Sequence, residues 1–198
     1  MYFYLKATEV NNYIQDEQFQ GLDFKENPVP PTEYENCIFI NCSFAGASLG
    51  KLSFMECEFE NCNFSSAKIA GTGFKEVVFR NCKLLGLAFD TCSDFLLSFR
   101  FSDSILNFSS FYRLKIPNTS FSNCRLQEVD FTEAELSGVN FSGSDLSGAI
   151  FQGSRLSNSD FRGAVNYSIN PQENVLTGAK FAIPEVVGLL DVYKIRVE

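Results

Sequence analysis

The chain has 198 residues with a formal net charge of −8, and 45% of them are hydrophobic, including 22 Phe but no Trp and no His. This length and composition suit one domain with a full core. The acidic balance argues against a general nucleic-acid binder, because phosphate contacts need Lys and Arg, and it leaves either a basic partner or solubility alone as the reason for the charge.

The N-terminal segment carries no sign of export. It begins Met-Tyr-Phe-Tyr-Leu-Lys, without the basic start and long apolar stretch of a signal peptide, and no run of 18 apolar residues follows. We therefore expect a cytoplasmic protein with no membrane contact. Residues 1–18 show no regular spacing of apolar residues and are predicted to form an N-terminal cap for the repeats that follow.

In two runs between residues 39 and 161 a large apolar residue occupies every fifth position, a period that fits neither a helix nor a strand and indicates an internal repeat. Before this, Phe19 and Phe24 begin the repeats, and residues 27–33, with three prolines, are predicted to be an irregular side. The first strict run is Phe39, Phe44, Leu49, Phe54, Phe59, Phe64, Ile69, Phe74, Phe79, Leu84 and Phe89. After two extra residues, which predict a bulge, the second run is Leu96, Phe101, Leu106, Phe111, Ile116, Phe121, Leu126, Phe131, Leu136, Phe141, Leu146, Phe151, Leu156 and Phe161.

The cysteines indicate how many repeats make one coil. Cys42, Cys62 and Cys82 are 20 residues apart, as are Cys37 and Cys57, and each precedes a large apolar residue by two positions. Twenty residues are four repeats, so these thiols are predicted to stack in columns inside a four-sided coil. We interpret them as inert core residues rather than metal ligands or disulfides, because the interior is apolar and no export signal is found.

The repeat unit has the form Ala-(Asp/Asn)-Leu-x-x, as in Phe131-Thr-Glu-Ala-Glu-Leu136-Ser-Gly-Val-Asn-Phe141. It resembles the pentapeptide repeat family. The resemblance implies an all-β fold, a right-handed quadrilateral β-helix with one pentapeptide on each side and four to a coil. The two strict runs then give about six coils, a rod on the order of 30 Å long at the spacing of neighbouring strands.

The last part of the chain leaves the repeat. After Phe161 the series returns only at Leu176 and Phe181, so the repeat domain is predicted to span residues 19–181. Residues 182–198 are predicted to form a separate module. Pro184 suits the first turn of a short helix, and the alternation of apolar and charged residues in 193–198 suits a short strand.

This C-terminal segment is similar to the final module of the quinolone-resistance (Qnr-type) pentapeptide repeat proteins. The resemblance implies a homodimer of two rods joined tail to tail, with the shape and charge of a DNA duplex, that binds DNA gyrase or topoisomerase IV and relieves the enzyme of quinolone poisoning. Many members carry two long loops between coils, whereas the main repeats here are interrupted only by two extra residues. The residues assigned to the dimer contact are Val186, Val187, Leu189, Leu190 and Val192.

The acidic residues favour the C-terminal coils as the surface that meets the partner. Residues 126–161 contain six acids and one base, whereas residues 75–125 contain seven bases and four acids. Asp or Asn is also ordinary before the inward residue of a repeat, so both interpretations stay open. The six acids assigned to partner binding are Glu128, Asp130, Glu133, Glu135, Asp145 and Asp160.

The sequence thus predicts a DNA-mimicking protein that protects or modulates a type II topoisomerase, with no catalytic site, cofactor or metal. The segment Gly46-Ala-Ser48-Leu-Gly50 matches the nucleophile pattern of hydrolases, but that pattern needs a base and the chain has no His. The alternative is a non-enzymatic scaffold that binds another protein through one flat side.

Overall fold

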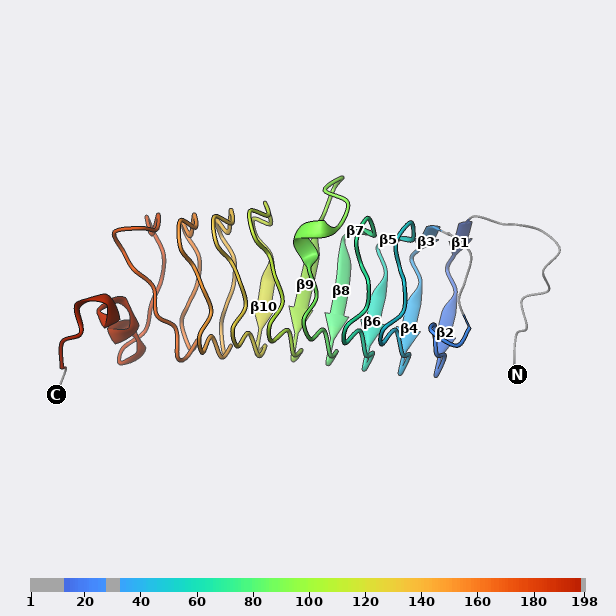
Figure 1. Cartoon of the computed structure of the whole chain (residues 1–198), viewed down its shortest axis with the longest axis horizontal. Coiled ribbons are helices and arrows are strands. Elements are labelled where there is room, and N and C mark those ends of the chain that lie inside the picture. Colours follow the sequence, from blue (N-terminus) through green and yellow to red (C-terminus); the bar gives the residue numbers. More distant parts are fainter. Residues whose placement is uncertain (1–12, 28–32, 197–198) are drawn as a thin grey trace.

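The protein is a rod of stacked coils (Figure 1). The computed structural model describes residues 13–27 and 33–196. Past the last strand, isolated parallel bridges continue the stacking up to the pair Asp160 and Lys180. One parallel sheet contains, in order, β1 (Tyr13–Gln15), β3 (Glu33–Glu35), β5 (Ser53–Met55) and β7 (Gly73–Lys75). The other contains, in order, β10 (Ser120–Ser122), β9 (Phe99–Ser102), β8 (Val77–Arg80), β6 (Glu58–Glu60), β4 (Ile38–Ile40) and β2 (Gln18–Gln20).

Each strand pairs with the strand one coil later in the chain. Phe19 lies opposite Phe39, and Phe39 lies opposite Phe59, so one coil takes 20 residues. With five residues to a side, the coil has four sides, as the cysteine spacing predicted. The all-β quadrilateral β-helix is confirmed.

A ladder of phenylalanine rings runs through the rod. This ladder is about 40 Å long at about 4.8 Å per coil. It exceeds the rod length of about 30 Å predicted from the two strict runs, because the stacking continues beyond the ends of both runs. Rings on neighbouring sides meet edge to face, as Phe111 and Phe121 do with centroids 5.4 Å apart. The stacked rings, with centroids 4.7–5.5 Å apart, belong to Phe19, Phe39, Phe59, Phe79, Phe101, Phe121, Phe141, Phe161 and Phe181.

The predicted columns of thiols are present. The Cys42 N–H donates to Cys62 Sγ at 3.4 Å, and Cys62 Sγ donates in turn to the Phe39 carbonyl at 3.3 Å. All seven cysteines are free, and six of them are buried. Burial raises the pKa of the Cys57 thiol to about 12. Cys57 is therefore a protonated core residue with little thiolate character.

Each side passes into the next through a corner residue in the left-handed backbone conformation. Asn81 has a φ of +51° and Gly138 a φ of +71°. Asn, Asp and Gly adopt this conformation at the least steric cost, which explains why they recur at five-residue spacing in the sequence. Between two corners, each side of the coil carries apolar side chains that point inward and polar side chains that point outward.

The two extra residues form a loop at 93–98, after the short 3-10 turn η1 (Phe89–Thr91). β8 pairs with β9 at an offset of 22 residues, so the position of the predicted bulge is confirmed. The prediction that Leu96 resumes the inward series is wrong. Leu96 is 54% exposed with a φ of +55°, and Phe99 is buried instead, with its ring centroid 5.7 Å from that of Phe74.

The coils begin earlier in the chain than predicted. Residues 13–18 were assigned to an N-terminal cap, but β1 pairs with β3, with Ile14 opposite Tyr34. The series of inward residues therefore includes both of these positions. The rest of the predicted cap, residues 1–12, lies outside the described residues, as do residues 28–32 of the predicted irregular side.

The C-terminal segment folds over the end of the last coil (Figure 1). The predicted short helix is found as two 3-10 turns, η2 (Glu185–Leu189) and η3 (Asp191–Tyr193). The predicted strand is wrong for residues 193–196, because Lys194 has a φ of +51°, which an extended strand does not allow. Residues 197–198 lie outside the described part. The helical segments in the described part of the chain are short 3-10 turns, and none of them could span a membrane.

Candidate interaction surface

The six predicted carboxylates point outward, but they do not form one patch. One side takes five residues and one coil twenty, so the four that directly precede an inward residue fall on four different sides of the rod. Glu128 and Glu133 lie at the corners before and after one of these sides. The four that precede an inward residue, each partly exposed, are Asp130, Glu135, Asp145 and Asp160.

A carboxylate directly before an inward residue helps to stabilise the turn at the corner that follows it. The Thr132 N–H donates to Asp130 Oδ1 at 2.8 Å, two residues back along the chain. Uncharged Asn140 accepts a bond from the Ser142 N–H at 2.9 Å in the same way. Such side-chain bonds to a backbone N–H two residues on stabilise turns whether or not the side chain is charged. The interpretation that Asp and Asn here belong to the repeat itself is therefore supported.

Arginine side chains pair with three of the six carboxylates. The guanidinium of Arg113 holds the pKa of Glu133 below its ordinary value. The hydrogen bonds from Arg162 lower the pKa of Asp160 to about 2. Half of the six predicted carboxylates are thus paired with a positive charge. The pairs, with N–O distances of 2.6–2.7 Å, are Arg113–Glu133, Arg155–Glu135 and Arg162–Asp160.

Asp145 is held by neutral groups. Partial burial acts to raise the pKa of Asp145, but hydrogen bonds from Asn166, Ser147 and Gln127 outweigh it and lower the pKa to about 2. Asp145 therefore carries its charge at neutral pH while serving as the acceptor of a local network.

A second acidic surface, spread like the first over several sides of the rod, lies on the N-terminal coils and was missed by the sequence prediction. Residues 13–60 contain nine acids and only two bases, a larger excess than in residues 126–161. Within 13–60, only Glu58 forms an ion pair among the described residues, with Arg80 at 3.6 Å. A count over the N-terminal third of the sequence would have found this surface. The nine acids are Asp16, Glu17, Asp23, Glu26, Glu33, Glu35, Glu56, Glu58 and Glu60.

Part of this surface follows one edge of the rod. Asp16, Asn36, Glu56 and Glu76 succeed one another at 20-residue intervals, with φ values of +51° to +59°, and we call them the acidic corner. Asn36 Nδ2 donates to Asp16 Oδ1 at 2.6 Å, so an amide separates the first carboxylate from the next. In the described part of the chain no ion pair reaches any of these side chains. The acidic corner therefore presents uncompensated charge.

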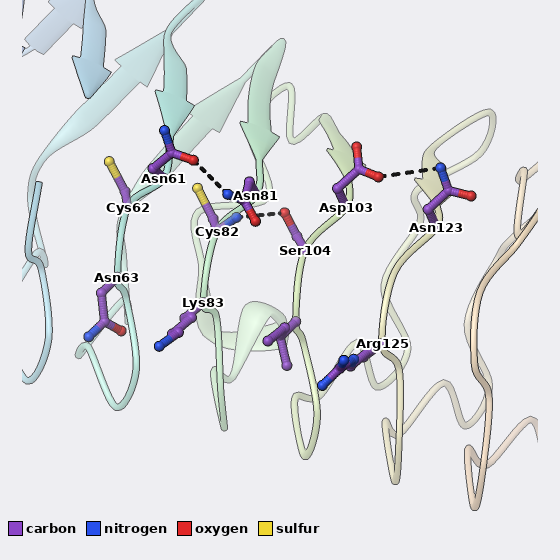
Figure 2. Close-up of a pocket in the computed structure, with 11 residues that line it drawn as sticks. Asn61, Cys62, Asn63, Asn81, Cys82, Lys83, Asp103, Ser104, Asn123 and Arg125 are labelled. Atoms are coloured by element: carbon purple, nitrogen blue, oxygen red, sulfur yellow. Dashed lines mark hydrogen bonds between the residues drawn. The ribbon is translucent and has the colours of Figure 1, made fainter. Parts of the chain in front are cut away.

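A shallow groove of about 520 Å³ runs beside another corner (Figure 2). Asn81 Nδ2 donates to Asn61 Oδ1 at 2.6 Å, and Asn123 Nδ2 donates to Asp103 Oδ1 at 3.3 Å. These polar groups bond one another along the rod instead of converging on one point (Figure 2). The arrangement stabilises this corner of the rod.

The comparison with protein families agrees with this geometry. The model of the pentapeptide repeats matches eight copies within residues 37–72, 57–93 and 124–163. The chain is a pentapeptide repeat protein. The structure extends the same stacking beyond the matched residues, from Phe19 to Phe181.

Two solved structures share the fold of this pentapeptide repeat protein. QnrB1, a plasmid-mediated fluoroquinolone resistance protein, is 19% identical, with a TM-score of 0.62 over 94% of this chain and 100% of the other. HetL, involved in heterocyst differentiation regulation in the cyanobacterium Nostoc sp. strain PCC 7120, is 17% identical, with a TM-score of 0.55 over 86% of each chain. A comparison with curated proteins gave no match. These likenesses show a shared fold alone.

The C-terminal residues assigned to a dimer contact divide into two groups. Leu189 packs against the core and so helps to hold the segment on the last coil, whereas Val186 is only partly buried. Val187, Leu190 and Val192 are exposed. Other exposed apolar side chains of the same segment extend this face, namely Ile183, Tyr193 and Ile195.

Proposed function

We propose that this pentapeptide repeat protein binds a type II topoisomerase, DNA gyrase or topoisomerase IV, by presenting an acidic rod to the basic surface that holds DNA. The acidic corner is the observation that carries the proposal, because its carboxylates are exposed and form no ion pair with any other described residue. B-DNA carries one charge per about 1.7 Å of axis, whereas one corner repeats once per coil, about 4.8 Å. Acids on the neighbouring sides must therefore contribute to the mimicry.

The likeness to QnrB1 in fold supports the choice of partner, since the resistance group is expected to relieve topoisomerases of quinolone poisoning. Binding would compete with DNA for the same basic surface, so the rod would act without catalysis, and it would act in the cytoplasm, where chromosomal DNA is handled in bacteria. Electrostatic steering would make the association fast and sensitive to salt.

A gyrase supercoiling assay, with and without a fluoroquinolone, tests the proposal. Substituting Asp16→Asn, Glu56→Gln and Glu76→Gln together should raise the concentration needed for any effect on gyrase by roughly tenfold, because three exposed charges are lost from one edge. Thermal unfolding should be unchanged, since corner side chains lie outside the core. Wild-type protein that alters neither supercoiling nor drug sensitivity at high molar excess would remove the assignment.

A matched control is available on the C-terminal coils. The substitutions Asp130→Asn, Asp145→Asn and Asp160→Asn remove the same number of charges, and Asn can keep the turn bond, as Asn140 does. These acids are spread over three sides, and Asp160 is paired, so a smaller effect is expected. Equal effects of the two sets would show that total charge matters and the acidic corner does not.

The second candidate is a non-enzymatic scaffold that binds another protein, and the comparable likeness to HetL favours it. A scaffold for another protein would leave gyrase unaffected. Substituting the acids of the acidic corner would then change nothing in the gyrase assay. The supercoiling assay therefore separates the two candidates.

We propose further that two rods join through the exposed apolar face of the C-terminal segment. Leu190→Asp should give a monomer by light scattering, because a charge would have to be buried in the contact. Leu190 suits this test better than Leu189, which is needed within the rod end. A wild-type protein that is monomeric at micromolar concentration contradicts the dimer.

A further inference from the structure

The loop at 93–98 exposes two large apolar side chains at the one break in the strict repeats. Phe95 is 77% exposed and Leu96 is 54% exposed. In Figure 1 this loop, drawn in green, projects farther from the rod than the neighbouring coils. The side one coil earlier is β7, a regular strand with its Phe inside. The insertion therefore turns apolar residues outward where the repeat would have buried one.

The loop is held at both ends. The Ser93 N–H donates to the Thr72 carbonyl at 3.0 Å, and the Ser98 N–H donates to the Phe74 carbonyl at 3.0 Å. Leu97, next to the exposed pair, packs against the core. These contacts fix the base of the loop on the outer edge of β7. Phe95 and Leu96 are thus presented by an anchored loop, which reduces the ordering cost of a contact.

The loop returns to the rod at the acidic corner. The Glu76 N–H donates to Ser98 Oγ at 2.7 Å, and Glu56 lies one coil earlier on the same corner. Asp94, beside Phe95, is exposed. Lys75 lies on the same side, but its Nζ is turned onto Met55 Sδ at 3.4 Å. The apolar tip is therefore continuous with a surface that is mainly acidic.

We propose that the loop at 93–98 is a docking element, in which Phe95 and Leu96 enter an apolar pocket on a protein whose surface beside that pocket is basic. Charge complementarity with the acidic corner selects a basic partner. Phe95 and Leu96 add an apolar contact from which water is excluded, which the charged groups do not provide. Such central apolar contacts, surrounded by polar ones, carry most of the affinity of protein interfaces. The inference rests on the proposed function, because the basic partner available for the test is gyrase.

The test measures the dissociation constant of purified gyrase for wild type and for the double variant Phe95→Ser, Leu96→Ser. The double variant should bind roughly 10- to 100-fold more weakly, mainly through faster dissociation, with its thermal unfolding unchanged. The acidic-corner variant should instead slow association and reduce its salt dependence. The two parts of the surface then have distinct kinetic effects.

Phe108→Ser is the matched control. Phe108 is 60% exposed at a different corner, with a φ of +64°, and Ser66 occupies the same conformation two coils earlier with a φ of +58°. This variant should bind gyrase as wild type does. Equal affinity of wild type and the double variant would overturn the docking loop alone, and so would an equal loss in Phe108→Ser. Wild type that fails to bind gyrase would overturn the proposed function and the docking loop together.

Discussion

Replacing Phe121 by alanine is expected to lower the free energy of unfolding by about 3–5 kcal/mol, the usual cost of emptying a large aromatic site in a core. Phe121 is fully buried in the middle of the ladder. Its ring stacks on Phe101 and Phe141, with centroids 5.1 and 5.5 Å away, and meets Phe111 and Phe131 edge to face. A square coil of fixed backbone cannot collapse around the missing ring, so most of the cavity should persist.

The loss should also change how the rod unfolds. Each coil contacts only its neighbours, so a weak step in the middle reduces the coupling between the two halves. Denaturant unfolding followed by circular dichroism should show both a lower midpoint and a broader transition. Phe108→Ala is the control, because its exposed side chain should change stability by no more than about 0.5 kcal/mol. A Phe121→Ala variant as stable as this control would mean that the ladder does not hold the coils together.

The fold could be predicted from the sequence because the period of the repeat is also the period of the contacts. Any residue and the one 20 positions later lie on neighbouring strands, so Cys42, Cys62 and Cys82 had to stack once the coil had four sides. The insertion removes this rule locally. Phe99 lies opposite Val77, in the regular inward position two residues before Phe101. Phe95, Leu96 and Leu97 are all apolar, and only the shape left beside Phe74 decides which of these three packs against the core. Spacing alone could not make that choice.

The surface was harder to predict because charge was counted along the chain and not around the rod. The pairing of Arg113 with Glu133, and of Arg155 with Glu135, spans 20 residues in each case and could have been read from the sequence once the coil was known. The same spacing places Glu56 and Glu76 on one corner, where no ion pair reaches them among the described residues. Counting by column would therefore have moved the predicted contact surface to the N-terminal coils.

The second large loss of stability is expected from Gly188→Ala, at the C-terminal end of the rod. Gly188 is buried in η2, where an added Cβ would overlap the Tyr167 carbonyl oxygen and lie 2.9 Å from the Tyr167 ring. The backbone of Tyr167 belongs to the last turn of the rod and cannot move aside as a flexible side chain could. The C-terminal segment must therefore lift, at a cost of about 1–3 kcal/mol typical of overpacked sites.

Two measurements identify this cause. At an ordinary backbone conformation with no overlap, Gly→Ala raises the free energy of unfolding by about 0.4–1 kcal/mol. A lower free energy of unfolding in Gly188→Ala would therefore point to the overlap with Tyr167. The Ile169 N–H donates to the Gly188 carbonyl at 3.1 Å, and its hydrogen exchange should speed up when the segment lifts. Val187→Ala, at a neighbouring exposed position, should leave that exchange unchanged. If Gly188→Ala stabilised the protein with Ile169 still protected, the last coil would have room for the methyl group, and the close packing of this segment would not be what holds it there.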